Sequence, residues 1–146
     1  MSRAGGQDPT ASGLPHRHPF LFVDSVVQIV PGESATAEKT FAAEDAMFAG
    51  HFPGNPVVPG VILTEALAQT AGIAVAREGD MLYLAAIKGM KFPRKCRPGE
   101  TIVLRALKRS TIGGLTQCEV IATVSDRVVA EGTLVLTSQA SGAPHT

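Results

Sequence analysis

The stretch VILTEALAQTAGIAVAR, residues 61–77, decides the fold class of this chain. It lacks proline and is rich in Ala and Leu, which predicts a helix over Val61–Arg77. Pro59 and Gly60 stand at the start of this helix, where a missing backbone N–H costs nothing. Because apolar residues fall on every side of the helix, the rest of the chain must cover it on every side. We therefore expect one long helix that is buried against a sheet.

Segments on both sides of the helix have the composition and the alternation that are typical of strands. The predicted strands are Phe20–Val30, Ser34–Phe41, Leu82–Lys88, Thr101–Ser110, Leu115–Ser125 and Arg127–Thr137. Glycine and proline interrupt Asp45–Pro56, which predicts a loop there. We assign the α+β class, with an antiparallel sheet wrapped around one long central helix. The hot-dog fold has this arrangement, although other α+β folds also bury a helix.

The 146 residues fit a single domain. We place that domain at residues 14–137. The flanking residues 1–13 and 138–146 are rich in Gly, Ser, Pro and Ala, which predicts disordered tails. Hydrophobic residues make up 45% of the chain and Trp is absent, so the core is expected to be aliphatic.

Composition excludes several classes of function. The formal net charge is zero, from 13 basic and 13 acidic side chains, so the basic excess typical of nucleic acid binding is missing. Cys96 and Cys118 are too few for a disulfide framework and fit free thiols in a reducing cytosol. Val57–Ala76 is apolar and long enough to span a bilayer, but Glu65 in its middle makes insertion costly. We expect a cytoplasmic protein that binds neither nucleic acid nor membrane.

The loop before the helix, GHFPGNPVVPG at residues 50–60, is the first candidate for chemistry. Its three glycines and three prolines restrict the backbone around a single histidine, His51. Histidine ordinarily titrates near neutral pH, which suits a general base. The open helix end adds the N–H groups of Gly60 and Val61, which could polarise a thioester carbonyl and stabilise its enolate-like anion.

Glu65 is the second candidate, because it is a carboxylate in an otherwise apolar helix. A buried carboxyl group needs a partner or stays protonated, and a protonated one can act as a general acid. Gln69 follows one turn later on the same face. The alternative is that Glu65 only stabilises the helix N-terminus.

Together these residues resemble a known family. His51-Phe52-Pro53-Gly54, Pro59-Gly60 and Glu65–Gln69 resemble the beta-hydroxyacyl-acyl carrier protein dehydratases of the FabZ family. The segment Leu14–Asp24 and four shorter pieces after the helix resemble it too, so the resemblance covers roughly residues 14–137.

The resemblance implies a role for each matched residue. His51 is the catalytic histidine and Glu65 the catalytic acid, with Gln69 supporting the carboxyl group. Gly60, with Val61, binds the thioester carbonyl. Phe52, Pro59 and Tyr83 line the acyl tunnel.

The resemblance also implies the reaction and its setting. A 3-hydroxyacyl chain, linked through phosphopantetheine to acyl carrier protein, loses water to give the trans-2-enoyl thioester, without metal or organic cofactor. The site forms across a homodimer, with His from one subunit and Glu from the other, and dimers can assemble as a trimer of dimers. His18 and Ser25 stand where the family usually has Tyr and Arg, which leaves fatty acid and polyketide or polyene biosynthesis both open.

A basic run, Lys91, Arg94, Lys95 and Arg97, has two interpretations: a solvated loop, or a docking surface for the acidic carrier protein. The same cations would favour the thiolate of Cys96. His16 and His18 could suggest metal together with His51, but no further ligand completes a set, so a structural role near the tunnel is expected. Two alternatives to the dehydratase remain: a hot-dog acyl thioesterase, and one subunit of a heteromeric dehydratase.

Overall fold

The computed structural model describes residues 6–51, 54–77 and 80–140. These residues form one long helix and six strands, with two short helical turns before the long helix. In chain order these elements are η1 (Pro9–Ser12), β1 (Ser25–Val30), β2 (Ser34–Thr40), α1 (Met47–Gly50), α2 (Gly60–Val75), β3 (Asp80–Lys91), β4 (Thr101–Ile112), β5 (Leu115–Val124) and β6 (Arg127–Ala140).

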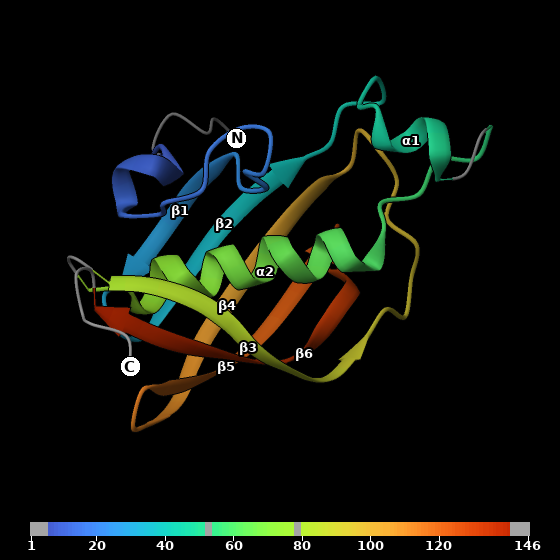
Figure 1. Ribbon diagram of the computed structural model, residues 1–146. Coiled ribbons are helices and arrows are strands. Elements are labelled where there is room, and N and C mark those ends of the chain that lie inside the picture. Colours follow the sequence, from blue (N-terminus) through green and yellow to red (C-terminus); the bar gives the residue numbers. More distant parts are fainter. Residues whose placement is uncertain (1–5, 52–53, 78–79, 141–146) are drawn as a thin grey trace.

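The strands form a single antiparallel sheet in the order β1-β2-β4-β5-β6-β3. Figure 1 shows α2 lying across one face of this sheet, whose strands curve around it. The predicted α+β class and the sheet wrapped around a central helix are confirmed. Strand β3 lies at one edge and pairs only with β6 within the described residues.

The core lies between α2 and the sheet, and it is mainly aliphatic, with Phe41 and Phe48 also buried. Leu67 of α2 and Ile102, Leu104 and Leu134 of the sheet are fully buried. The segment between η1 and β1 lies beside α2, next to β1 (Figure 1). Leu14 of that segment is buried with the core. The sheet and this segment together bury most of the apolar surface of α2, whereas Val61 near its start stays exposed.

Three local features differ from the expectations. The predicted loop Asp45–Pro56 contains the short helix α1. Residues 6–13, expected within a disordered tail, instead include η1, and Gln7 pairs with Val26 through two backbone hydrogen bonds. Strand β6 continues to Ala140, beyond the expected end of the domain at residue 137.

No helix in the described part of the chain is both long and apolar enough to cross a membrane.

Candidate active site

His51 is held by the loop that the sequence singled out. It follows α1 directly, and its Nδ1 lies 3.0 Å from the carbonyl oxygen of Val57. A carbonyl oxygen only accepts, so the proton of the neutral imidazole resides on Nδ1 and the lone pair on Nε2. The Val57 N–H donates back to the His51 carbonyl at 3.3 Å, which closes the loop. The local backbone therefore sets both the orientation and the tautomer of a potential base.

The N-terminus of α2 lies beside this imidazole. His51 and Gly60 line one cavity of about 210 Å³, together with Phe92. The N–H groups of Ile62 and Leu63 donate to the Pro59 carbonyl. The N–H groups of Gly60 and Val61, the first two residues of α2, donate to no backbone carbonyl among the described residues.

Phe92 is a neighbour of the helix end that sequence reasoning missed. A Cβ on Gly60 would lie only 3.1 Å from Cζ of the Phe92 ring, so glycine is what lets the ring approach. The available signals were the place of Phe92 next to the basic run and the family-like piece Lys91-Phe92.

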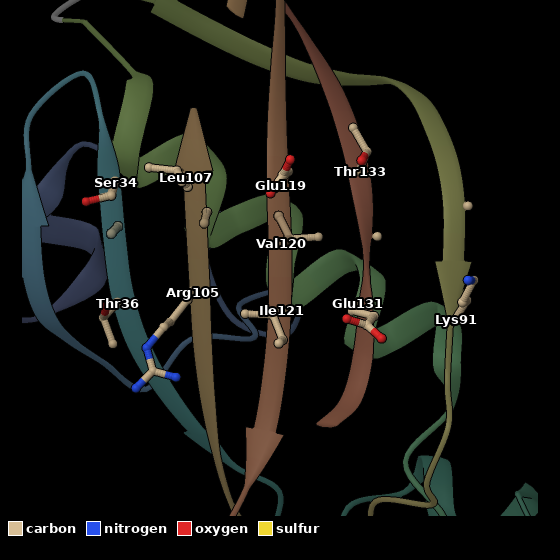
Figure 2. A pocket seen from close by; sticks show the side chains of 14 residues that line it. Ser34, Thr36, Lys91, Arg105, Leu107, Glu119, Val120, Ile121, Glu131 and Thr133 are labelled. Carbon is tan, nitrogen blue, oxygen red and sulfur yellow. The ribbon is translucent and has the colours of Figure 1, made fainter. Parts of the chain in front are cut away.

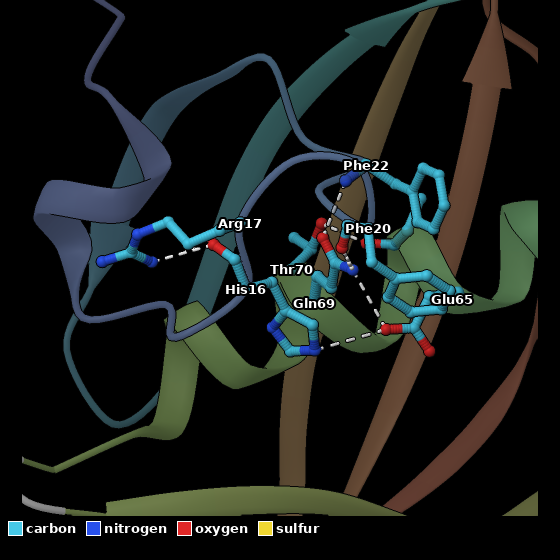
Figure 3. Close-up of polar contacts among 8 residues, drawn as sticks. His16, Arg17, Phe20, Phe22, Glu65, Gln69 and Thr70 are labelled. Carbon is cyan, nitrogen blue, oxygen red and sulfur yellow. Dashed lines mark hydrogen bonds and ion pairs between the residues drawn. The ribbon is translucent and has the colours of Figure 1, made fainter.

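Glu65 lies in a different set of contacts. Its Oε2 accepts a hydrogen bond from Gln69 Nε2 at 3.0 Å and lies 3.5 Å from His16 Nε2 (Figure 3). The N-cap of α2 is Pro59, with no side-chain cap. Glu65 also lies beyond the first turn, where the helix dipole no longer favours an acid, so the alternative that it only stabilises the helix N-terminus is wrong.

Gln69 anchors this carboxyl group to the N-terminal segment. Its side chain is almost fully buried at 1% exposure. Its Oε1 accepts from the Phe22 N–H at 2.9 Å, and its Nε2 donates to the Phe20 carbonyl at 3.0 Å as well as to Glu65. A buried amide whose donors and acceptor are engaged fixes the position of Glu65 relative to residues 20–22.

Glu65, Gln69 and His16 line a second cavity of about 230 Å³. Tyr83 of β3, one of the predicted tunnel residues, also lines it. His51 is not among its lining residues, nor is Glu65 among those of the His51 cavity. The structure therefore places His51 and Glu65 in separate cavities, the histidine cavity and the glutamate cavity.

The other two predicted tunnel residues are Pro59 and Phe52. Pro59 is half-buried at the start of α2. Phe52 lies outside the described residues.

The basic run does not form one surface. Arg94 and Lys95 line the His51 cavity. The Arg97 Nη1 donates to Asn55 Oδ1 at 2.8 Å, which ties the run to the histidine loop. Lys91 instead borders a groove of about 660 Å³ on the face of the sheet away from α2, and Arg105 lines the other side of that groove (Figure 2).

The cations near Cys96 in the sequence do not favour its thiolate in the folded protein. Cys96 is buried, and burial, with a smaller contribution from Glu100, raises the pKa of its thiol to about 12. Burial also raises the pKa of Cys118, to about 11. Across residues 6–51, 54–77 and 80–140, no three His, Cys, Asp or Glu side chains are grouped to hold a metal ion.

The family described as "FabA-like domain" matches residues 14–139. The FabZ 3-hydroxyacyl-acyl-carrier-protein dehydratase of Ruminiclostridium cellulolyticum is 44% identical over 123 residues, which cover 82% of this chain and 87% of that protein. The corresponding enzyme of Verminephrobacter eiseniae is 38% identical over 138 residues, or 90% of this chain and 92% of the relative.

Solved structures support the fold alone. The dehydratase heterocomplex ApeI:P from Xenorhabdus doucetiae matches with a TM-score of 0.74 at 15% identity, over 90% of this chain and 91% of that chain. A sigma28-regulated virulence protein from Campylobacter jejuni matches with a TM-score of 0.69 at 14% identity, over 90% and 88%. From the matched domain and the curated relatives together, we conclude that this chain belongs to the FabA-like family, among its FabZ 3-hydroxyacyl-acyl-carrier-protein dehydratases.

Proposed function

We propose that this protein removes water from 3-hydroxyacyl chains on acyl carrier protein in fatty acid biosynthesis, with His51 and Glu65 as its catalytic pair. The supporting observation is that His51 and Glu65 line separate cavities and that each side chain is held by its own hydrogen bond, so that each cavity would be one half-site. A base and an acid that must bracket one substrate require both half-sites together. A second copy of the chain supplies the missing half.

The edge strand β3 offers the surface for that second copy. Its free edge carries apolar side chains that a lone protomer leaves exposed, such as Tyr83 at 49% and Ile87 at 54%. A long apolar edge strand is a template for pairing with another chain. Pairing of β3 with its own copy would join two sheets into one and cover these side chains.

The same pairing would complete the site. The glutamate cavity borders Leu82, Tyr83 and Leu84 near the start of β3, whereas the histidine cavity borders Phe92, just beyond its end. An antiparallel pair about a two-fold axis near the middle of β3 brings the start of one strand beside the end of the other. The glutamate cavity of one subunit then faces the histidine cavity of its partner. Assembly into a trimer of dimers is compatible with this arrangement.

The proposed reaction uses these groups in defined roles. His51 Nε2 takes a proton from C2 of the thioester, and the developing charge moves onto the thioester oxygen at the amides of Gly60 and Val61. The C3–O bond breaks as Glu65 gives its proton to the departing hydroxyl, so water and the trans-2-enoyl thioester form. His51 then holds the proton that Glu65 has lost, and exchange with solvent resets both. The thioester itself acidifies C2, so the scheme needs no cofactor.

The substrate is proposed to arrive on the side of the histidine cavity. Arg94 and Lys95 line that cavity and carry the charge that suits an acidic carrier protein and the phosphate of its phosphopantetheine arm. Lys91 and Arg97 are less direct candidates, since one faces the outer groove and the other binds Asn55. A cytoplasmic location completes the proposal and agrees with the two free thiols.

Mass spectrometry of 3-hydroxyacyl carrier protein incubated with the purified protein alone tests the proposal. We expect the acyl carrier protein to lose one water with the wild type, but not with His51→Ala or Glu65→Gln. The exposed residues His18 and Glu44 provide matched controls, His18→Ala and Glu44→Gln, which should behave as the wild type.

The same assay separates the alternatives. Release of free carrier protein thiol without enoyl product would identify a thioesterase. Absence of turnover until a partner protein is added would identify a subunit of a heteromeric dehydratase. Unchanged dehydration by His51→Ala would refute the catalytic assignment.

A further inference from the structure

His16 has an environment that a merely structural residue would not need. Its Nε2 faces Glu65 Oε2 at 3.5 Å, and both side chains are largely covered, with 28% and 22% exposed. Its Nδ1 is fully buried, and no described residue pairs with it. The loop around it is fixed, because Arg17 Nη1 donates to the carbonyls of Leu14 and His16 at 2.7 and 2.8 Å.

These contacts select one tautomer of the neutral imidazole. A proton on Nδ1 would bury an N–H without an acceptor, and would leave the Nε2 lone pair facing a carboxyl oxygen. A proton on Nε2 turns the same contact into a donor–acceptor pair. The distance of 3.5 Å exceeds that of a well-formed hydrogen bond, as is common for catalytic contacts before substrate binds.

The direction of the contact also distinguishes the two oxygens of Glu65. Both Gln69 Nε2 and His16 Nε2 approach Oε2, and Figure 3 shows the other oxygen turned away from them. An oxygen that accepts from two N–H donors is the poorer place for a proton. The acidic proton of Glu65 therefore belongs on Oε1.

We propose that His16 is a positioning residue that, as the neutral Nε2–H tautomer, works with Gln69 to hold Glu65 Oε2 and so directs the proton on Oε1 toward the substrate. This inference rests on the proposed role of Glu65. It assigns to His16 a function that reaches the reaction through another side chain, without contact with the substrate.

A pair of substitutions tests which nitrogen matters. The amide nitrogen of Gln can reach the position of Nε2, whereas that of Asn reaches only the position of Nδ1. We expect His16→Gln to keep kcat within about threefold of the wild type, and His16→Asn to lower kcat about ten- to a hundredfold with little change in KM, since misplacement of a catalytic group has this scale of effect. His18→Gln and His18→Asn on the neighbouring exposed histidine are the matched controls. Equal kcat for His16→Gln and His16→Asn would overturn the proposal.

A second measurement does not depend on turnover. The 15N NMR spectrum of histidine-labelled wild type, with His16 assigned by its loss in His16→Gln, should show the proton of neutral His16 on Nε2. A proton on Nδ1 would overturn the proposal even if His16→Asn failed to fold. Full activity of Glu65→Gln would instead reject the acid role of Glu65, and the NMR result would still report on the His16 contact.

Discussion

Replacing Gln69 with Met should destabilise the protein, because two backbone groups that bind the Gln69 amide would lose their hydrogen-bond partner. The side chains are similar in volume, so the core changes little in packing. The amide, however, accepts from Phe22 N–H at 2.9 Å and donates to the Phe20 carbonyl at 3.0 Å, and its residue is only 1% exposed. A buried polar group without a partner costs roughly 1–3 kcal/mol.

The Phe22 N–H and the Phe20 carbonyl, both left without a partner, together set the expected loss of stability. Because both bonds are only partly buried, we take the lower part of that range, about 2–4 kcal/mol in total. Glu65 also loses a donor, but it is partly exposed and can turn to water, so it adds little. For a chain of this size the loss corresponds to a fall in Tm of roughly 5–15 °C.

The assay is thermal unfolding followed by circular dichroism at one fixed protomer concentration, because association also shifts Tm. Gln28→Met, the same substitution at an exposed position of β1, is the control and should leave Tm within about 2 °C of the wild type, as surface substitutions usually do. An equal Tm for Gln69→Met and the wild type would refute the reasoning, since it would mean that the Phe20 and Phe22 groups find other partners at no cost.

Two further perturbations follow from other parts of the fold. Gly132→Ala should destabilise the protein by about 1–3 kcal/mol, because a Cβ there would lie 2.8 Å from Cα of Met90 on the neighbouring strand. Urea unfolding measures this loss. Gly114→Ala is the control, since its Cβ would lie an ordinary 3.6 Å from the Ser138 carbonyl oxygen. Cys96, with its thiol pKa raised to about 12, should react with a disulfide reagent far more slowly in the native protein than in denaturant, and faster as pH rises toward that value; rapid labelling of native Cys96 near neutral pH would contradict its burial.

The sequence predicted the main elements of the fold because they depend on local pattern. A helix that is apolar on all sides and strands that alternate between turn signals leave few arrangements, and α2 and the sheet follow them. Short features were missed because they do not depend on a local pattern. The single turn of α1 and the pairing of Gln7 with Val26 rest on tertiary contacts that no periodicity announces.

The site residues also fall into two groups: those that a local sequence pattern marks, and those that only the fold brings together. His51 and Glu65 stand out as chemistry-bearing residues in a rigid loop and an apolar helix, so sequence alone could nominate them. The contact of His16 with Glu65 joins residues 49 positions apart, by the difference 65 − 16, and depends on how the N-terminal segment folds over α2. Cys96 shows the converse case: its charged neighbours in sequence would favour the thiolate, whereas its burial in the fold suppresses ionisation.

The proposed division of the site between two subunits can be tested by mixing inactive variants. His51→Ala and Glu65→Gln should each abolish turnover alone, whereas a mixed dimer should contain one site with both groups intact. Random exchange makes about half of the dimers mixed, with one active site of two, so the account predicts recovery of roughly a quarter of wild-type dehydration. Refolding the two variants together and recovering no activity, while a wild-type sample treated identically regains it, would contradict the claim that His51 and Glu65 meet across a dimer.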